Sequence, residues 1–157
     1  MPITPVLSAR WRGCCFDALN VHELQYIYMV RQQVFCVEQH CAYLDVDGLD
    51  DAAWHLAAWS DAQRPPLAYA RVLAPGVKYA EPAIGRVLTF GAGRGVGLGR
   101  ELIRRAVAQV LAAYPQQGIR LSAQSHLQDF YREAGFQPVG AIYLEDDIPH
   151  IEMHRPP

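Results

Sequence analysis

Two stretches of the chain repeat their apolar residues at the spacing of an α-helix. In the first, Asn20 and Glu23 stand three residues apart, as in a capping box, and the apolar side chains that follow fall on one helical stripe. This pattern predicts a helix over about residues 21–37. In the second, apolar residues keep a helical period over 102–111 until a Tyr-Pro pair at 114–115 stops it, which predicts a second long helix.

Short apolar segments bounded by Pro, Gly or Asp have the pattern of strands. Residues 53–59, 67–73 and 84–90 follow one another in this way, and we expect them to form a meander joined by hairpins. Residues 119–124 alternate apolar and polar side chains, which predicts a further strand after the second long helix.

The last part of the chain is predicted to form a short helix and two more strands. A short helix is predicted to end at Ala134, with Gly135 as its C-terminal cap, and two final strands over about 139–144 and 148–154 can pair across two aspartates. The predicted order is strand, helix, three strands, helix, strand, helix and two strands. This order indicates an α/β (α+β) fold with a mixed sheet rather than a doubly wound one.

Composition narrows the class of protein. The 157 residues suit one domain with one core, here expected over 1–157, and a composition of 51% apolar and 19% charged residues is that of a soluble globule. Lysine and arginine number 14 against 16 acidic residues, so no positive field exists to gather a polyanion, and nucleic acid is not expected as a partner.

The expected location is the cytoplasm. The first residues contain two prolines and neither a basic region nor a long apolar one, and nowhere do about 18 uncharged apolar residues run together, so no membrane partner is expected. The four cysteines include an adjacent pair too cramped for an ordinary bridge, and we interpret all four as reduced thiols: Cys14, Cys15, Cys36 and Cys41.

Glycines alternate through the segment that enters the second long helix, at every second position from 91 to 99, and Arg94 and Arg100 flank the second half. Glycine lets the backbone wrap closely around a ligand, and the first turn of a helix has unpaired N–H groups and the positive end of a dipole. A phosphate or pyrophosphate is therefore the predicted guest. The alternative is a merely flexible turn between strand and helix.

Two known phosphate loops do not fit this segment. A P-loop needs Gly-Lys-Ser or Gly-Lys-Thr, but Gly99 is followed by Arg100 and Glu101. A dinucleotide loop needs a third glycine where this chain has Val96, Leu98 or Arg100, and an acidic residue that is missing near 115–120. What remains is Arg94-Gly95-Val96-Gly97-Leu98-Gly99, which resembles the R/Q-x-x-G-x-G/A loop with which the GNAT superfamily of N-acetyltransferases cradles the pyrophosphate of acetyl-CoA.

The resemblance extends along the chain from about residue 10 to 154. The segment Phe130-Tyr131-Arg132-Glu133-Ala134-Gly135-Phe136 is similar to the F-Y-x-x-x-G-F helix end of that superfamily, and further segments at 34–39, 47–50, 121–124 and 145–150 are similar to its ElaA-like branch. The resemblance implies a GNAT-like, mostly antiparallel central sheet flanked by helices and splayed between the strands around the glycine loop. It also implies an acetyl-CoA-dependent N-acyltransferase that acetylates a primary amine by direct attack, without a metal.

Family resemblance also assigns the cofactor-binding residues. Backbone groups near Leu88 and Thr89 would pair with the pantetheine arm, one N–H facing the thioester oxygen, and Gln124 stands where many members have an asparagine that bonds pantetheine. The full expected set is Leu88, Thr89, Arg94, Gly95, Val96, Gly97, Leu98, Gly99, Arg100 and Gln124.

Acyl transfer to an amine needs a proton for the departing thiolate and an unprotonated nucleophile. Tyr131 matches the position from which a phenol commonly protonates the thiolate, and its unperturbed pKa of about 10 keeps it protonated at neutral pH. The alternative is an ordinary core aromatic. The strand before the loop lacks the carboxylate that relatives often use as a base. The candidates elsewhere, each alternatively a surface charge or a hydrogen bonder in a strand, are Glu38, Glu145, His150 and Glu152.

Several polar residues leave alternatives open. Arg86 lies in an apolar strand, where it either orients a substrate carboxylate or pairs with a nearby acid. An acidic loop follows the first helix and lacks the EF-hand spacing, so it is either a solvated charge cluster, which is slightly favoured, or a region that attracts a cationic amine. Its members are Asp45, Asp47, Asp50 and Asp51.

Two other functions compete with acetyl transfer. Cys36, His40 and Cys41, with His55 as a fourth ligand, would suit a metal, which makes a metallohydrolase the weaker enzyme alternative. A non-catalytic acyl-CoA sensor would keep the glycine loop without turnover. The acceptor itself is expected to be a small-molecule or peptide amine, and the sequence leaves open whether the chain forms a homodimer.

Overall fold

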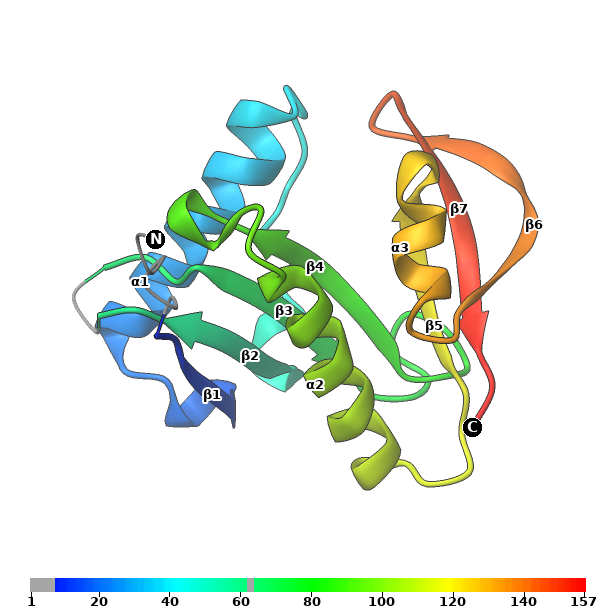
Figure 1. The fold of residues 1–157 in the computed structure, drawn as a ribbon, viewed down its shortest axis with the longest axis horizontal. Coiled ribbons are helices and arrows are strands. Elements are labelled where there is room, and N and C mark those ends of the chain that lie inside the picture. Colours follow the sequence, from blue (N-terminus) through cyan, green and yellow to red (C-terminus); the bar gives the residue numbers. More distant parts are fainter. Residues whose placement is uncertain (1–7, 62–63) are drawn as a thin grey trace, which may run out of the picture.

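The computed structural model describes residues 8–61 and 64–157. Its centre is a seven-stranded sheet in the order β1-β2-β3-β4-β5-β7-β6, in which every neighbouring pair is antiparallel except β4 and β5 (Figure 1). The strands are β1 Arg10–Cys15, β2 Trp54–Trp59, β3 Ala68–Leu73, β4 Ala83–Thr89, β5 Ile119–Gln124, β6 Gln137–Glu145 and β7 Ile148–Arg155. The predicted mixed sheet and the predicted meander are confirmed.

The capping box predicted at the first helix is present. The Asn20 side chain accepts a hydrogen bond from the Glu23 N–H at 2.9 Å, and the Glu23 carboxylate accepts one from the Asn20 N–H at 3.0 Å. Helix α1 then spans Val21–Arg31 and continues as a π-helical segment, Gln32–Glu38, so the expected helix forms but widens in its last turns.

Helices α1 and α2 cover opposite faces of the sheet. Helix α2, Leu98–Ala113, buries Leu102 and Val110 in a cluster that includes Leu56 of β2, whereas Ile27 of α1 packs in a second cluster that includes Trp59. Residues 56 and 59 of one strand point to opposite faces because side chains alternate along a strand. The burial of β2 and β3 on both faces explains why their sequences read as nearly continuous apolar runs.

The sheet opens between β4 and β5. These strands share one pair of partners, Ala83 and Arg120, and then diverge, as Figure 1 shows. A bulge in β4 accompanies the divergence: the register with β3 shifts between Tyr69 and Arg71, and Arg86 adopts a φ of +53°. The splayed sheet implied by the family resemblance is therefore confirmed.

The third helix lies beyond the opening. Helix α3, Gln128–Arg132, follows β5 and is capped by Gly135, whose φ of +93° requires glycine, as predicted. All four cysteines are free thiols, in agreement with the sequence. Among the described residues, no helix has the length and apolar character needed to span a membrane.

Candidate active site

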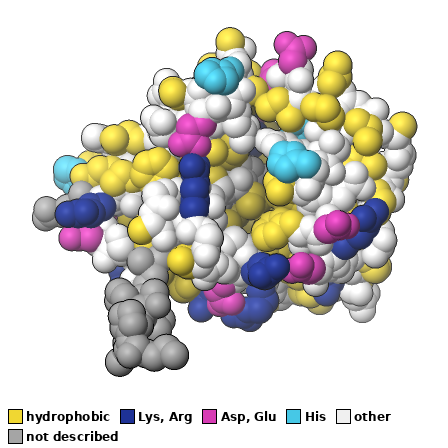
Figure 2. All heavy atoms as spheres, turned by 45° about the horizontal axis from the view of Figure 1, so that its top comes forward, with side chains coloured by type: hydrophobic (Ala, Val, Ile, Leu, Met, Phe, Trp, Pro, Cys, Tyr) yellow, Lys and Arg dark blue, Asp and Glu magenta, His cyan; other side chains and the backbone are white. Residues whose placement is uncertain are grey.

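Two cavities meet where the sheet opens. The larger, of about 500 Å³, lies between β4, β5 and the β6–β7 hairpin, and the smaller, of about 330 Å³, follows the glycine loop. Val87, Leu127 and Tyr131 line both cavities. The space-filling view shows the hollow on this face, lined largely by hydrophobic side chains with charged groups around its mouth (Figure 2). We call the larger space the acceptor cavity and the smaller one the glycine groove.

The glycine groove has the geometry of an anion site. Gly95 and Gly97 have φ of +73° and +83°, and Gly97 is the N-cap of α2, so the loop turns directly into the helix. A Cβ at either glycine would meet open space, which shows that the requirement for glycine there is conformational. The first-turn N–H groups of α2, at Leu98 and Gly99, lie beside the groove and can bind a phosphate oxygen.

The two arginines of the loop are held by carboxylates. Arg94 donates to the Thr89 carbonyl at 3.1 Å and to Glu38 at 2.7 Å, while Arg100 pairs with Glu133 at 2.7 Å. Glu38, one of the candidate bases, thus lies against the glycine loop and does not line the acceptor cavity. Of the loop residues expected to bind cofactor, Gly95, Gly97, Leu98, Gly99 and Arg100 line the groove, whereas the Arg94 and Val96 side chains do not.

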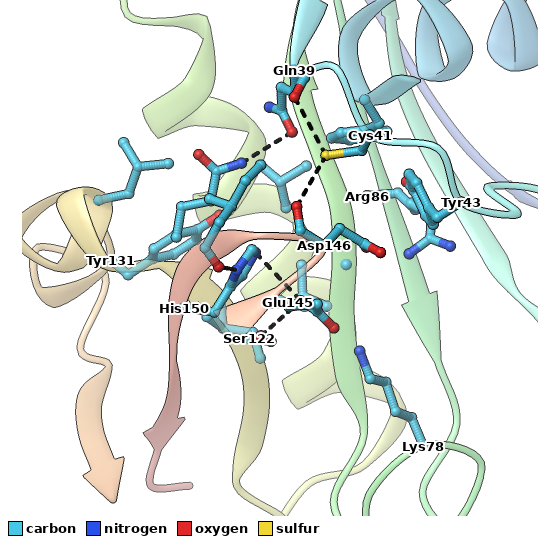
Figure 3. A pocket seen from close by; sticks show the side chains of 18 of the residues that line it. Gln39, Cys41, Tyr43, Lys78, Arg86, Ser122, Tyr131, Glu145, Asp146 and His150 are labelled. Carbon is cyan, nitrogen blue, oxygen red and sulfur yellow. Dashed lines mark hydrogen bonds and ion pairs between the residues drawn. The ribbon is translucent and has the colours of Figure 1, made fainter. Parts of the chain in front are cut away.

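The free edge of β4 forms one wall of the groove. Leu88 and Thr89 pair with β3 on one side, and because β5 has already diverged, none of the described strands pairs with them on the other side. Both residues line the groove. Gln124, at the end of β5, lies instead in the acceptor cavity, where its amide donates to the Gln39 side chain at 3.1 Å across the opening (Figure 3).

Tyr131 stands between the two cavities. Its side chain is buried in the core, with Phe130 and Phe136 packed edge-on at centroid distances of 5.0 and 6.1 Å. This burial raises the pKa of the phenol above its ordinary value. Within the described part of the chain its hydroxyl has no hydrogen-bond partner, so the phenol is a protonated donor without an acceptor.

A chain of polar side chains lines the acceptor cavity on the β5–β7 side (Figure 3). His150 Nδ1 lies 2.7 Å from the Ile148 carbonyl oxygen, and His150 Nε2 lies 3.3 Å from the Glu145 carboxylate. The same carboxylate accepts a hydrogen bond from Ser122 at 3.4 Å, and Ser122 also bonds the Tyr143 hydroxyl. Of the four candidate bases, only Glu145 and His150 line this cavity; Glu152 pairs with Arg120 at 3.2 Å outside it.

Three of the four aspartates of the acidic loop are paired with arginines, whereas Asp51 is exposed. Asp45 and Asp50 are only 6% and 3% exposed, because each aspartate pairs with two arginines at 2.6–3.2 Å. The pairs close into a ring of alternating charge, here called the charge ring: Arg31, Asp45, Arg86, Asp47, Arg71 and Asp50. The expectation of a solvated cluster is wrong for Asp45, Asp47 and Asp50, because their arginine partners come from α1, β3 and β4.

The charge ring also decides between the alternatives for Arg86. Its guanidinium pairs with Asp45 at 2.8 Å and Asp47 at 3.2 Å, so it neutralises the ring, although one side of it borders the acceptor cavity. Burial works against ionisation of Asp47, but hydrogen bonds from Arg71 and the charges of both arginines outweigh it and hold its pKa at about 2. Three arginines alternate with three aspartates in the ring, so their formal charges cancel.

The residues of the metal alternative do not come together. His55 is buried, with Nδ1 2.7 Å from the Tyr69 hydroxyl and Nε2 2.8 Å from the Asp50 carbonyl oxygen, so both ring nitrogens are engaged. Cys41 lines the acceptor cavity and its thiol donates to the Gln39 carbonyl at 3.4 Å. Among the residues placed by the structure, no group of three or more His, Cys, Asp or Glu could hold a metal ion.

The acceptor cavity also contains residues that the sequence did not single out. They include Gln39, Tyr43, Lys78 and Ser122. The segments that contain Gln39 and Ser122 were noted only for their resemblance to the ElaA-like branch. Composition offered one signal, because Lys78 is the only lysine of the chain. The others carry no local signature that distinguishes them from surface residues.

Comparisons with known proteins agree with this geometry. Residues 74–155 match the family described as "Acetyltransferase (GNAT) domain". The UPF0039 protein sll0451 of Synechocystis sp. is 41% identical over 94% of this chain and 95% of its own length, and the protein ElaA of Escherichia coli is 37% identical over 92% and 95%.

Solved structures have the same fold. An acyl-CoA N-acyltransferase from Pseudomonas aeruginosa superimposes with a TM-score of 0.88 at 43% identity, covering 94% of this chain and 99% of the other. The crystal structure of Escherichia coli ElaA gives a TM-score of 0.87 at 35% identity with the same coverage. The splayed sheet, the glycine loop at the start of α2 and these relatives together show that the chain belongs to the GNAT acetyltransferase family.

Proposed function

We propose that this protein is an N-acetyltransferase that moves the acetyl group of acetyl-CoA to a primary amine bound in the acceptor cavity. The observation that carries the proposal is the position of Tyr131, whose phenol stands where the glycine groove meets the acceptor cavity. A thioester that passes from one cavity into the other would bring its sulfur to this point.

The groove residues are suited to hold CoA. The N–H groups at the start of α2 would bind the pyrophosphate, and the free edge of β4 at Leu88 and Thr89 would pair with the pantetheine amides. Gln124 could exchange its bond with Gln39 for one to pantetheine. Acetyl-CoA supplies the activated acyl group, and a β4 N–H facing the cavity would polarise its carbonyl oxygen.

We assign the removal of the amine proton to His150. The Ile148 carbonyl can only accept a hydrogen bond, so Nδ1 carries a hydrogen, and in the neutral ring the lone pair is on Nε2. Nε2 faces the Glu145 carboxylate, which is also an acceptor, across 3.3 Å. An ammonium group bound to the Glu145 carboxylate would therefore lie beside this lone pair, where Nε2 can take its proton.

The reaction balances with these two residues. The acceptor binds as an ammonium group and loses two protons in the reaction. His150 takes the first, directly or through water, and the freed lone pair of the amine forms the new bond to the acetyl carbon. The carbon–sulfur bond breaks, the sulfur receives the Tyr131 proton, and the second nitrogen proton passes through water to restore the phenol. Glu145 stabilises the imidazolium that forms, as an adjacent carboxylate does for other histidine bases.

Thiol release from acetyl-CoA in the presence of a panel of primary amines tests the proposal, with the N-acetyl product identified by mass. We expect amine-dependent release of CoA. His150→Gln should lower kcat/KM at least a hundredfold for alkylamines, which are protonated at neutral pH, and much less for hydroxylamine, which is largely unprotonated there. Tight binding of acetyl-CoA without turnover of any amine would contradict the proposal and favour the acyl-CoA sensor.

A further inference from the structure

The charges around the acceptor cavity do not cancel once the internal ion pairs are counted. Arg86 and Asp47 border the cavity but belong to the charge ring, which has no net charge. The remaining charged side chains that line the cavity are Lys78, Glu145 and Asp146. Two are carboxylates near His150, and the third is a cation that has no ion pair among the described residues.

Lys78 is an exposed residue whose ammonium group contacts an aromatic ring and no carboxylate among the described residues. It lies in the loop between β3 and β4, where its ammonium sits over the Tyr79 ring at 5.3 Å from the centroid. Figure 3 shows its amine pointing toward the cavity, with Glu145 and His150 between Lys78 and Tyr131 in this view. A cation–π contact orients an ammonium group but leaves its positive charge uncompensated, so Lys78 can still bind an anion.

The distance between the two ends of the cavity restricts the ligand. Val87 lies at the junction with the groove, and the strand then runs back to Ala83, close to the loop that bears Lys78. Four residues of extended strand cover roughly 13 Å, and the acceptor nitrogen must reach the thioester at the junction to react. An acceptor that also places an anionic group near Lys78 therefore needs several bonds between the two groups, and an α-amino acid, whose amine and carboxylate are separated by a single carbon, is too short.

Resting on the function proposed above, we propose that the acceptor is a small molecule with a primary amine at one end and an anionic group several bonds away, such as an ω-amino acid or a dipeptide. Its ammonium group binds at Glu145 and His150, and its anionic group binds at Lys78. A cavity of about 500 Å³ accommodates a molecule of this size.

A set of matched acceptors tests the inference. 6-Aminohexanoate, n-hexylamine and 1,6-diaminohexane share one carbon chain and differ in whether the far end is anionic, neutral or cationic. We expect kcat/KM to decrease in that order, with a preference of at least fivefold for 6-aminohexanoate over n-hexylamine. Glycine, which is too short, should be a poorer acceptor than 6-aminohexanoate.

Variants of Lys78 link this preference to one side chain. Lys78→Met keeps the length and removes the charge, so the preference for 6-aminohexanoate over n-hexylamine should fall below about twofold. Lys78→Arg should restore it. The wild-type preference should also weaken as salt rises from 0.05 to 0.5 M, because an accessible ion pair is screened. A preference that persists in Lys78→Met would overturn the anion site.

The two proposals fail in different ways. If all three six-carbon acceptors are acetylated equally, N-acetyl transfer stands and the anion site is wrong. If no amine is acetylated, the proposed function falls, and calorimetry of 6-aminohexanoate in the presence of CoA then decides the inference on its own. Binding at least fivefold tighter to the wild type than to Lys78→Met supports the anion site, and equal binding or none refutes it.

Discussion

Replacing Tyr131 by phenylalanine removes one hydroxyl group from the junction of the two cavities and leaves the ring in place. The ring makes the packing contacts, edge-on against Phe130 and Phe136, and these are kept. The hydroxyl has no hydrogen-bond partner among the described residues, so the substitution breaks no internal bond. We therefore expect the free energy of unfolding to change by less than about 0.5 kcal/mol, and the melting temperature by less than about 2 °C.

The effect on turnover should be far larger. A positioned general acid typically contributes 10²- to 10⁴-fold, so Tyr131→Phe should raise the barrier by roughly 3 to 5 kcal/mol. Burial raises the pKa of Tyr131 above the ordinary value for a phenol, so the wild-type phenol keeps its proton through pH 10. We therefore expect kcat of the wild type to show no loss from this group below pH 10.

Tyr69→Phe is the matched control, since it removes a hydroxyl from a tyrosine that is equally buried but lies away from both cavities. The Tyr69 hydroxyl is 2.7 Å from His55 Nδ1, and its loss leaves a buried ring nitrogen without a partner. This should cost about 1 to 3 kcal/mol, or roughly 5 °C in melting temperature, with kcat within about twofold of the wild type.

The assay is kcat at saturating acetyl-CoA from pH 6 to 10, beside a thermal melt, for all three proteins. If Tyr131→Phe keeps kcat within about twofold, Tyr131 is not the acid and water or the thiol's own acidity supplies the proton. A fall in melting temperature as large as that of Tyr69→Phe would instead show that the Tyr131 hydroxyl makes a stabilising hydrogen bond in the fold.

Three further predictions concern the glycine loop and the charge ring. Gly97→Val should weaken acetyl-CoA binding at least tenfold. Gly76→Val is the control and should leave binding unchanged, because Gly76 has a φ of +82° against +83° at Gly97 and a Cβ at either position meets open space. Equal affinities of the two variants in calorimetry would contradict the assignment of the groove to acetyl-CoA. Asp45→Asn should lower the melting temperature by roughly 10 °C because it leaves buried arginines uncompensated, while the exposed Asp51→Asn should stay within about 1 °C. Because the pKa of Asp47 is about 2 in the fold and 3.8 unperturbed, its stabilising contribution should be complete above pH 4 and be lost as pH falls to 2; an unchanged acid limb in Asp47→Asn would contradict this.

Local signals in the sequence determined the elements and the glycine loop. A capping box, a helical period and a C-terminal glycine each act within a few residues, so Asn20, Glu23 and Gly135 have in the fold the roles that the sequence predicts. The phosphate loop is equally local, because positive φ at Gly95 and Gly97 is a property of those residues and the anion site is the start of the helix that follows.

Tertiary structure decided which charges are free. Asp45 and Asp50 read as a solvated loop because their partner Arg31 lies 14 and 19 residues away, and Arg86 lies 41 residues from Asp45. Pairing at such separations depends on how α1 and β4 pack beside the loop. Sequence periodicity therefore does not predict these ion pairs. The same packing pairs Arg86 with two aspartates, whereas Lys78 has no ion pair among the described residues.

The acceptor cavity itself is a product of the splayed sheet. A hairpin places Glu145 near His150, which the sequence could suggest, but only the divergence of β4 from β5 brings this pair to the same cavity as Tyr131. The sequence therefore determined the loop that we expect to bind phosphate, since a helix start and positive φ are local. It could not determine what lies opposite the phosphate, because that depends on side chains that meet only when the two halves of the sheet separate.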